Sequence, residues 1–281
     1  MKKTLTPIKN VPMPHHDDAE FHYRAKKSLG QHFLRSTHVA DLIAESAHIT
    51  KKDIVLEIGP GRGILTRALL ARSGKVIAVE KDAHLIPELA LKFKGEIISS
   101  KLKLCEDDIL EFDLKKHNLT AGEYILVANI PYYITGPILR AFIGGEHHPL
   151  HAVLLVQHEV ARRIIARDKK ESILSIAIKA YGTPQYVKKV PASFFSPAPK
   201  VDSAILLIEN ISRKNFSTPA EEKRFFEIIH AAFAHKRKKL GGNLKPLLGE
   251  RGAELLAKCA IDPHARAEDV AFEKWLCLVQ E

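Results

Sequence analysis

Four consecutive residues, Asn129-Ile-Pro-Tyr132, combine groups that can act on an aromatic amine. The exocyclic nitrogen of adenine is a poor nucleophile because its lone pair is delocalised into the ring. The side-chain oxygen of Asn129 and a backbone carbonyl such as that of Ile130 can accept its two N–H groups and favour a pyramidal, more nucleophilic nitrogen. Pro131 stiffens the turn that aims these acceptors, and Tyr132 offers a ring for an extruded base to stack on. The tetrapeptide predicts chemistry on an adenine amine, whereas the alternative is a β-turn with a buried tyrosine.

A glycine-rich turn around Gly59 and Gly61 separates a predicted strand (53–58) from a predicted helix (64–72). Glycines at this place let the backbone turn tightly and approach a ligand closely. Glu80 ends the next predicted strand, where a carboxylate can accept hydrogen bonds from both ribose hydroxyls of a nucleoside. The turn and the acid together predict a nucleoside cofactor.

Asp108 follows a third, weaker predicted strand at 102–104. A carboxylate at that strand end can accept a hydrogen bond from the amine of a cofactor adenine, or it can cap a helix. The glycine spacing G-x-G-x-G differs from the G-x-G-x-x-G of nicotinamide dehydrogenases. A dehydrogenase, which is the alternative for such a fold, would also need a hydride-transfer partner that we do not find in the sequence.

Strand-like and helix-like segments alternate from residue 53 to residue 166. Further strands are predicted at 75–79, 124–128 and 152–156, and further helices at 83–94, 137–143 and 159–166. This alternation predicts parallel strands with crossover helices, hence an α/β fold with a Rossmann-like, doubly wound sheet. Two later β-rich segments, 187–190 and 204–208, can add an antiparallel edge.

The character of the chain changes near residue 211. Helical periodicity replaces the β-branched runs, and short helices are predicted at 221–234, 240–248, 253–260 and 270–279. We therefore predict a flexible tail (1–27), a catalytic α/β domain (28–210) and a small all-helical domain (211–281).

The formal net charge of +10 and the pI near 9.4 favour a polyanionic partner. The predicted helical domain contains a basic run that can contact phosphates; its alternative is a solvated helix face. The members of this candidate RNA-binding run are Lys236, Arg237, Lys238 and Lys239.

The three cysteines are far apart and form no CxxC pattern, which argues against a disulfide framework and fits a reducing cytoplasm. The sequence has no apolar run near the ~18 residues of a membrane span. No spacing of histidines and acids matches a metal site, so we predict neither a metal nor a membrane partner.

Together these motifs resemble the KsgA/Dim1 family of ribosomal RNA adenine dimethyltransferases, which is related to the Erm antibiotic-resistance methylases. The resemblance runs from about residue 28 to residue 208 and resumes weakly near 261–268. The segments that carry it are Leu29–Leu34, Glu57–Gly63, Val79-Glu80, Asp108–Leu110, Asn129–Tyr132, Gln157–Glu159 and Phe195–Ser203.

The resemblance implies a class I methyltransferase that uses S-adenosyl-L-methionine. His32 and Leu34 would fold over the methionine end of the cofactor, with Gly59 against it. Glu80 would hold the ribose and Asp108 the adenine amine. Asn129 would sit where cofactor and target base meet, and Phe195 would pack against that base opposite Tyr132. The family usually has Asn at the position of His32, and a histidine can still donate through a ring nitrogen.

The resemblance also implies a target and a cellular setting. The expected activity is dimethylation of two adjacent adenosines in the 3′-terminal hairpin loop of small-subunit (16S) rRNA, during ribosome biogenesis. The expected partners are that rRNA and the immature small ribosomal subunit. Independently of the resemblance, we assume a monomer, and the cysteine pattern favours the cytoplasm. Two alternatives stay open: an Erm-like methylase of large-subunit rRNA, and a non-catalytic RNA-binding assembly factor.

Overall fold

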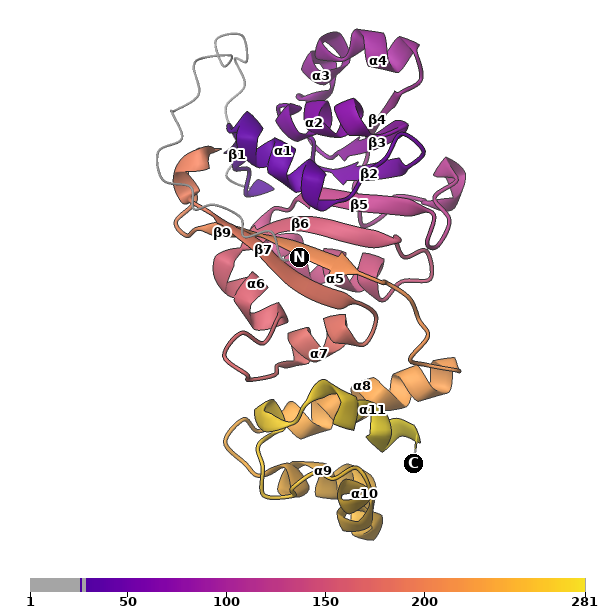
Figure 1. Ribbon diagram of the computed structural model, residues 1–281, viewed down its shortest axis with the longest axis vertical. Helices are drawn as coiled ribbons and strands as arrows, with labels where there is room; N and C mark the ends of the chain where they lie inside the picture. Colours follow the sequence, from indigo (N-terminus) through magenta and orange to yellow (C-terminus); the bar gives the residue numbers. More distant parts are fainter. Residues whose placement is uncertain (1–25, 27–28, 281) are drawn as a thin grey trace, which may run out of the picture.

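The computed structural model describes residue 26 and residues 29–280, and a seven-stranded sheet forms its centre (Figure 1). The strand order is β4-β3-β2-β5-β6-β9-β7. The strands from β4 to β6 run parallel, whereas β9 is antiparallel to both β6 and β7, as predicted for the two late segments. Their bounds are β2 Ile54–Ile58, β3 Lys75–Glu80, β4 Leu102–Glu106, β5 Tyr124–Asn129, β6 His151–Gln157, β7 Thr183–Val190 and β9 Ser203–Glu209.

Helices cover both faces of the sheet (Figure 1). Neighbouring residues of one strand, such as Val55 and Leu56, join different core clusters because strand side chains alternate between faces. One face packs against α1 (Thr37–Ser46), α2 (Ile64–Arg72) and α3 (Ile86–Lys92). The other packs against α5 (Thr135–Ile143), α6 (His158–Ile164) and α7 (Ile173–Lys179). These two layers confirm the predicted doubly wound class.

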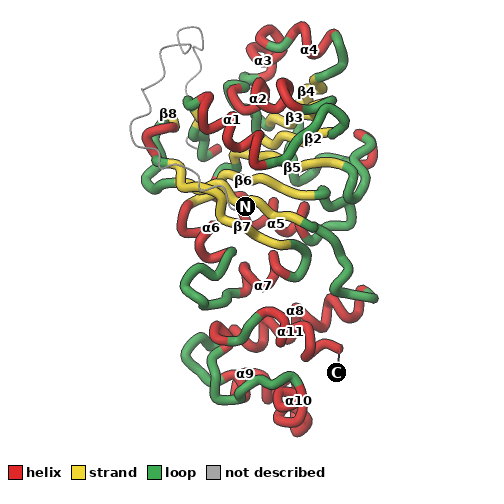
Figure 2. The backbone as a smooth tube through the Cα atoms, viewed as in Figure 1, coloured by secondary structure: helices red, strands yellow, loops and turns green. Residues whose placement is uncertain are grey.

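The last four helices gather beyond α7, and Figure 2 shows no strand among them within the described residues. They are α8 (Pro219–Phe233), α9 (Leu240–Leu248), α10 (Gly252–Lys258) and α11 (Phe272–Gln280). Their buried centre is Trp275, whose indole N–H donates to the carbonyl of Val270 at 3.2 Å. This helical core is continuous with the core beneath the sheet. The predicted helical C-terminal region is confirmed, and its limits as a domain stay a prediction.

Several elements of the fold were not predicted from the sequence. A two-stranded sheet joins β1 (Phe33–Leu34) to β8 (Phe195–Ser196), which lie far apart in the chain. Short helices also occur at α4 (Lys94–Ile98), η3 (Lys115–His117), η4 (Tyr132–Ile134), η5 (Ala192–Phe194), η6 (Gly249–Arg251) and η7 (Ala267–Asp269). The predicted tail lies outside the described residues except for Lys26.

The inference against a disulfide is wrong. Cys259, at the end of α10, is bonded to Cys277 in α11, with 5.7 Å between their Cα atoms. The packing of α11 brings together two cysteines 18 residues apart, and spacing alone could not reveal this. Cys105 is a free thiol. Among the described residues, none of the helices has the length and apolarity needed to cross a membrane.

The turn before α2 generates the first prediction. Gly63 has a φ of +76°, and a Cβ added there would lie 2.5 Å from the buried ring of Phe93. We therefore expect Gly63→Ala to lower the free energy of unfolding by about 2–4 kcal/mol, from backbone strain and overpacking. Urea unfolding measures this change. Gly95→Ala is the matched control, since its Cβ would meet nothing within 4 Å; equal losses in both variants would contradict the account.

Candidate functional site

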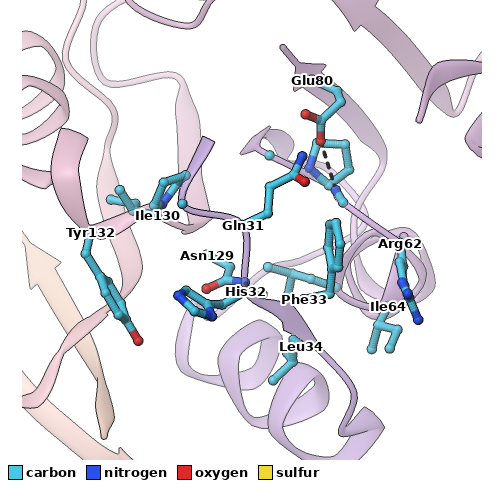
Figure 3. Close-up of a pocket in the computed structure, with 16 residues that line it drawn as sticks. Gln31, His32, Phe33, Leu34, Arg62, Ile64, Glu80, Asn129, Ile130 and Tyr132 are labelled. Carbon is cyan, nitrogen blue, oxygen red and sulfur yellow. Dashed lines mark hydrogen bonds between the residues drawn. The ribbon is translucent and has the colours of Figure 1, made fainter. Parts of the chain in front are cut away.

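A pocket opens where the ends of β3 and β5 meet the turn after β2, at the carboxyl edge of the parallel strands (Figure 3). Its volume is about 80 Å³. Three segments line it: the residues around β1, the glycine turn with the start of α2, and the end of β5. The lining residues are Gly30, Gln31, His32, Phe33, Leu34, Gly59, Pro60, Gly61, Arg62, Ile64, Leu65, Glu80, Asn129, Ile130, Pro131 and Tyr132. Most residues predicted to form the site therefore lie together.

The glycine turn is held against the end of β3. The backbone N–H of Gly59 donates to the carbonyl of Val79 at 2.9 Å, and that of Gly61 donates to Glu80 Oε2 at 3.1 Å. Gly61 has a φ of +57°, and a Cβ there would lie 3.0 Å from the Phe33 ring. The guanidinium of Arg62 lies 5.1 Å from the centroid of the same ring. Glycine is therefore needed both for the turn and for the close approach of Phe33.

Glu80 is a buried carboxylate at the centre of this arrangement. Its side chain accepts backbone hydrogen bonds from Gly61 and, through Oε1, from Asp82 at 3.0 Å. Burial raises the pKa of Glu80, and the two backbone donors oppose that rise. The carboxylate is thereby fixed in orientation at the edge of the pocket, and dashed lines in Figure 3 show its bond to the turn.

Glu57, one strand away, has no such donors. It is fully buried in β2, and neither carboxylate oxygen makes a hydrogen bond to the described residues. Burial raises the pKa of Glu57 to about 8; the Thr66 side chain opposes that rise, and the charge of Glu80 adds to it. The group is therefore mainly protonated at neutral pH. Glu57 belongs to the Glu57–Gly63 motif, so the sequence marks its position. The spacing of the motif does not reveal that its carboxylate oxygens lack hydrogen-bond partners among the described residues.

The end of β5 presents the tetrapeptide to the pocket. Asn129 Nδ2 donates to the carbonyl of His32 at 3.1 Å, which ties the strand end to the β1 segment. The Pro131 carbonyl accepts the N–H of Ile134 and closes the following turn. The Tyr132 hydroxyl lies 2.8 Å from the buried Ser203 Oγ. Burial raises the pKa of the Tyr132 phenol. The tyrosine ring is therefore held at the pocket wall by β9.

His32 contacts two parts of this wall. Its ring lies 5.9 Å from that of Tyr132 at an interplanar angle of 27°, which is a stacked arrangement. Its Nδ1 lies 2.7 Å from the carbonyl oxygen of Pro197. Figure 3 shows the imidazole beside the tyrosine, on the side of the pocket away from Glu80.

Two predicted site residues lie outside the pocket. The Asp108 carboxylate forms an ion pair with Lys81 at 2.5 Å and accepts the N–H of Leu110, and these contacts lower its pKa. Phe195 is 4% exposed and pairs with Leu34 across the two-stranded sheet. The predicted roles of Asp108 at the cofactor adenine and of Phe195 at the target base stay predictions.

The basic run lies elsewhere, in the exposed link between α8 and α9. All four of its members are exposed, and the ammonium of Lys239 lies 3.3 Å from His264 Nδ1. Residues that the sequence reasoning missed are Gln31, Phe33 and Arg62 at the pocket and Asp82 beside it. Gln31 and Phe33 belong to the Leu29–Leu34 motif, so the sequence indicated their segment but not their individual contacts. Among the described residues, no three His, Cys, Asp or Glu side chains gather as metal ligands.

Comparison with known proteins decides the family. The profile described as "Ribosomal RNA adenine dimethylase" matches residues 22–281. The chain belongs to the ribosomal RNA adenine dimethylase family. It is an enzyme of the methyltransferase class, as the sequence motifs predicted.

Curated relatives named "Ribosomal RNA small subunit methyltransferase A" span nearly the whole chain. That of Dehalococcoides mccartyi (strain BAV1) is 41% identical over 260 residues, covering 91% of this chain and 88% of the relative. That of Fusobacterium nucleatum is 36% identical over 262 residues, covering 92% and 97%.

Two solved structures extend the likeness to three dimensions. The 23S rRNA methyltransferase ErmE superposes with a TM-score of 0.74 at 27% identity, covering 88% of this chain and 98% of that structure. A dimethyladenosine transferase from Plasmodium falciparum gives a TM-score of 0.72, also at 27% identity, with 88% and 96% covered. This member of the dimethylase family therefore shares its fold with ErmE and with a dimethyladenosine transferase.

Glu57 generates a prediction of pH dependence. The pKa of its carboxyl is about 8 in the folded protein against 4.5 as the ordinary value, so only the folded state keeps the proton between them. Its stabilising contribution is full below the lower value and is lost as the pH rises towards the upper one. Between about pH 5 and pH 8, we expect wild type to lose roughly 3–5 kcal/mol of unfolding free energy relative to Glu57→Gln. Urea unfolding at both pH values tests this, and identical pH slopes in the two proteins would contradict it.

Proposed function

We propose that this chain transfers methyl groups from S-adenosyl-L-methionine to the N6 atoms of two adjacent adenosines in the 3′-terminal hairpin of small-subunit rRNA. The observation that carries this proposal is the convergence of Glu80, Gly61, Asn129 and Tyr132 on one pocket. The first two fit a nucleoside cofactor, and the last two fit an adenine amine beside it.

The pocket residues fit S-adenosyl-L-methionine, which when bound supplies an electrophilic methyl on a sulfonium. Glu80 already has both oxygens oriented by backbone donors, and each oxygen keeps a further lone pair for a ribose hydroxyl. The turn at Gly59 and Gly61 allows close backbone approach. His32 and Leu34 line the opposite wall. To accept a hydrogen bond from the cofactor adenine, Asp108 would have to give up its ion pair with Lys81.

The target amine would meet Asn129. Because Asn129 Nδ2 is bonded to the His32 carbonyl, the orientation of the amide is fixed and Oδ1 serves as an acceptor. The second acceptor would be the backbone carbonyl of Ile130, which lines the same pocket. Two acceptors hold the amine with its lone pair directed at the methyl carbon. Catalysis would then come mainly from positioning and from fixed dipoles.

Proton removal needs no strong base. As the methyl left the sulfonium, its bond to sulfur would break and the cofactor would become a neutral thioether, while the amine nitrogen would become cationic and acidic and its proton could pass to water. Tyr132 would stack on the extruded base, a contact worth ~1–3 kcal/mol. Phe195 would have to leave its buried position to pack on the other face of that base.

Small-subunit rRNA is the better-supported target because relatives of that name are 36–41% identical over about nine tenths of the chain. ErmE, at 27% identity, supports the fold but a more distant relationship. The helical region 211–281 would then contact the RNA of the immature subunit through the basic run. We propose a monomer that works in the cytoplasm.

Methyl transfer to purified unmethylated small subunits, large subunits and bare RNA tests this function. We expect N6,N6-dimethyladenosine on small subunits alone, with a rate lowered about 100-fold or more in Asn129→Ala because a fixed dipole is lost. Gln185→Ala, which removes an amide from the outer strand β7, is the control and should retain the wild-type rate. Label on large subunits would instead indicate the Erm type, and RNA binding without transfer would indicate an assembly factor.

The basic run generates a separate prediction for RNA affinity. Replacing Lys236 and Arg237 with alanine should weaken binding and reduce the slope of log K against log salt by about 1.4–1.8, since two phosphate contacts are lost. Filter binding of small-subunit RNA at several salt concentrations measures the slope. Lys51→Ala/Lys52→Ala removes the same charge at the amino end of β2, opposite the pocket, and should leave the slope unchanged. Equal slopes for both double variants would exclude the run as the RNA contact.

A further inference from the structure

Asp82 is a buried carboxylate two residues beyond Glu80, and the mechanism above gives it no role. Its side chain is 0% exposed. It accepts hydrogen bonds from Gln31 Nε2 and from the ammonium of Lys26, both at 2.9 Å. His84 contributes its backbone N–H and its ring Nδ1, each 3.2 Å from Oδ1. A buried charge with these partners is costly to disturb, because removing them would leave it desolvated and unpaired.

Of the two partners that are distant in sequence, Gln31 belongs to the segment that covers the cofactor pocket, and Lys26 precedes that segment in the chain. We call residues 29–34 the N-terminal strap. Gly30 to Leu34 line the pocket, and the Phe33 ring lies against Gly61. Figure 3 shows the Gln31 side chain extending from the strap towards the Glu80 side of the pocket. The Gln31 carbonyl oxygen Oε1 accepts the backbone N–H of Lys26 at 2.7 Å, which joins the two partners of Asp82.

The strap is anchored at its other end by backbone pairing. Leu34 pairs with Phe195 in the two-stranded sheet, and the N–H of Arg35 donates to the Phe194 carbonyl at 2.8 Å. The segment is thus fixed on the β8 side by backbone bonds, at His32 by the Asn129 amide, and on the β3 side by side chains that meet at Asp82. Loss of the attachment at Asp82 would free the Gln31 end while the β8 end stays paired.

We propose that Asp82 is a positioning residue that holds the N-terminal strap over the cofactor site and thereby sets how long the cofactor stays bound. The backbone N–H of Asp82 donates to Glu80 Oε1. The residue that holds the strap is therefore coupled directly to the carboxylate proposed to bind the ribose. This inference rests on the proposed function for the identity of the ligand, but not for the attachment of the strap.

Asp82→Asn tests the attachment, since it removes the negative charge and keeps the shape. In the free protein, we expect hydrogen exchange of the backbone amides of residues 29–34 to accelerate at least about tenfold. Dissociation of S-adenosylhomocysteine should accelerate by a similar factor, with a raised KM for the cofactor and a largely retained kcat at saturation. The matched control is Asp53→Asn, which removes a carboxylate bonded to Thr50 at the opposite end of β2. It should change none of these quantities.

Exchanging the amide and the carboxylate between positions 31 and 82 distinguishes loss of the strap attachment from general destabilisation of the fold. Gln31→Glu alone places two carboxylates face to face and should also release the strap. In the double variant Gln31→Glu/Asp82→Asn, the introduced amide can donate to the introduced carboxylate, so slow exchange and slow dissociation should return. Recovery would not be expected if either single change merely weakened the fold.

The outcomes for the strap and for the proposed function are distinguishable. Strap exchange and cofactor dissociation that stay at wild-type values in Asp82→Asn would overturn the inference, as would defects that add up in the double variant. Faster strap exchange in Asp82→Asn, in a protein that binds no S-adenosylhomocysteine, would support the attachment and contradict the proposed function instead.

Discussion

The site depends on one buried carboxylate whose two oxygens are held by backbone N–H groups. Glu80 joins the glycine turn, through Gly61, to the loop after β3, through Asp82. The turn contacts Phe33 and the loop binds Gln31, so Glu80 joins the two parts of the structure that hold the strap. Burial makes the ionised form of Glu80 costly, and the backbone donors offset part of that cost. A preorganised acceptor of this kind can bind a nucleoside without rearranging itself.

The sheet explains why so much of this site could be predicted. Parallel strands place their carboxyl ends at one edge, so motifs that follow successive strands must meet there. The short apolar runs and the residues at their ends therefore predicted both the doubly wound fold and the union of Gly59, Glu80 and Asn129. The same reasoning does not predict the orientation of Asp108, which follows the expected strand but forms an ion pair with Lys81.

The features that escaped prediction depend on contacts between segments distant in sequence. The pairing of Phe33 with Ser196, the bond between Gln31 and Asp82 and the disulfide from Cys259 to Cys277 have no local periodicity or spacing that would reveal them. His32 is an intermediate case. The family resemblance marked its position, whereas its contacts with Tyr132 and Pro197 follow only from the tertiary structure.

The central claim is that one pocket at the sheet edge holds the cofactor with its reactive end directed at Asn129. A crystal structure of the protein with S-adenosylhomocysteine tests it most directly. The account predicts ribose hydroxyls on Glu80, the strap attached to Asp82 through Gln31, and the sulfur on the side of Asn129 and Tyr132. A ligand bound elsewhere, or bound with its ribose away from Glu80, would contradict it.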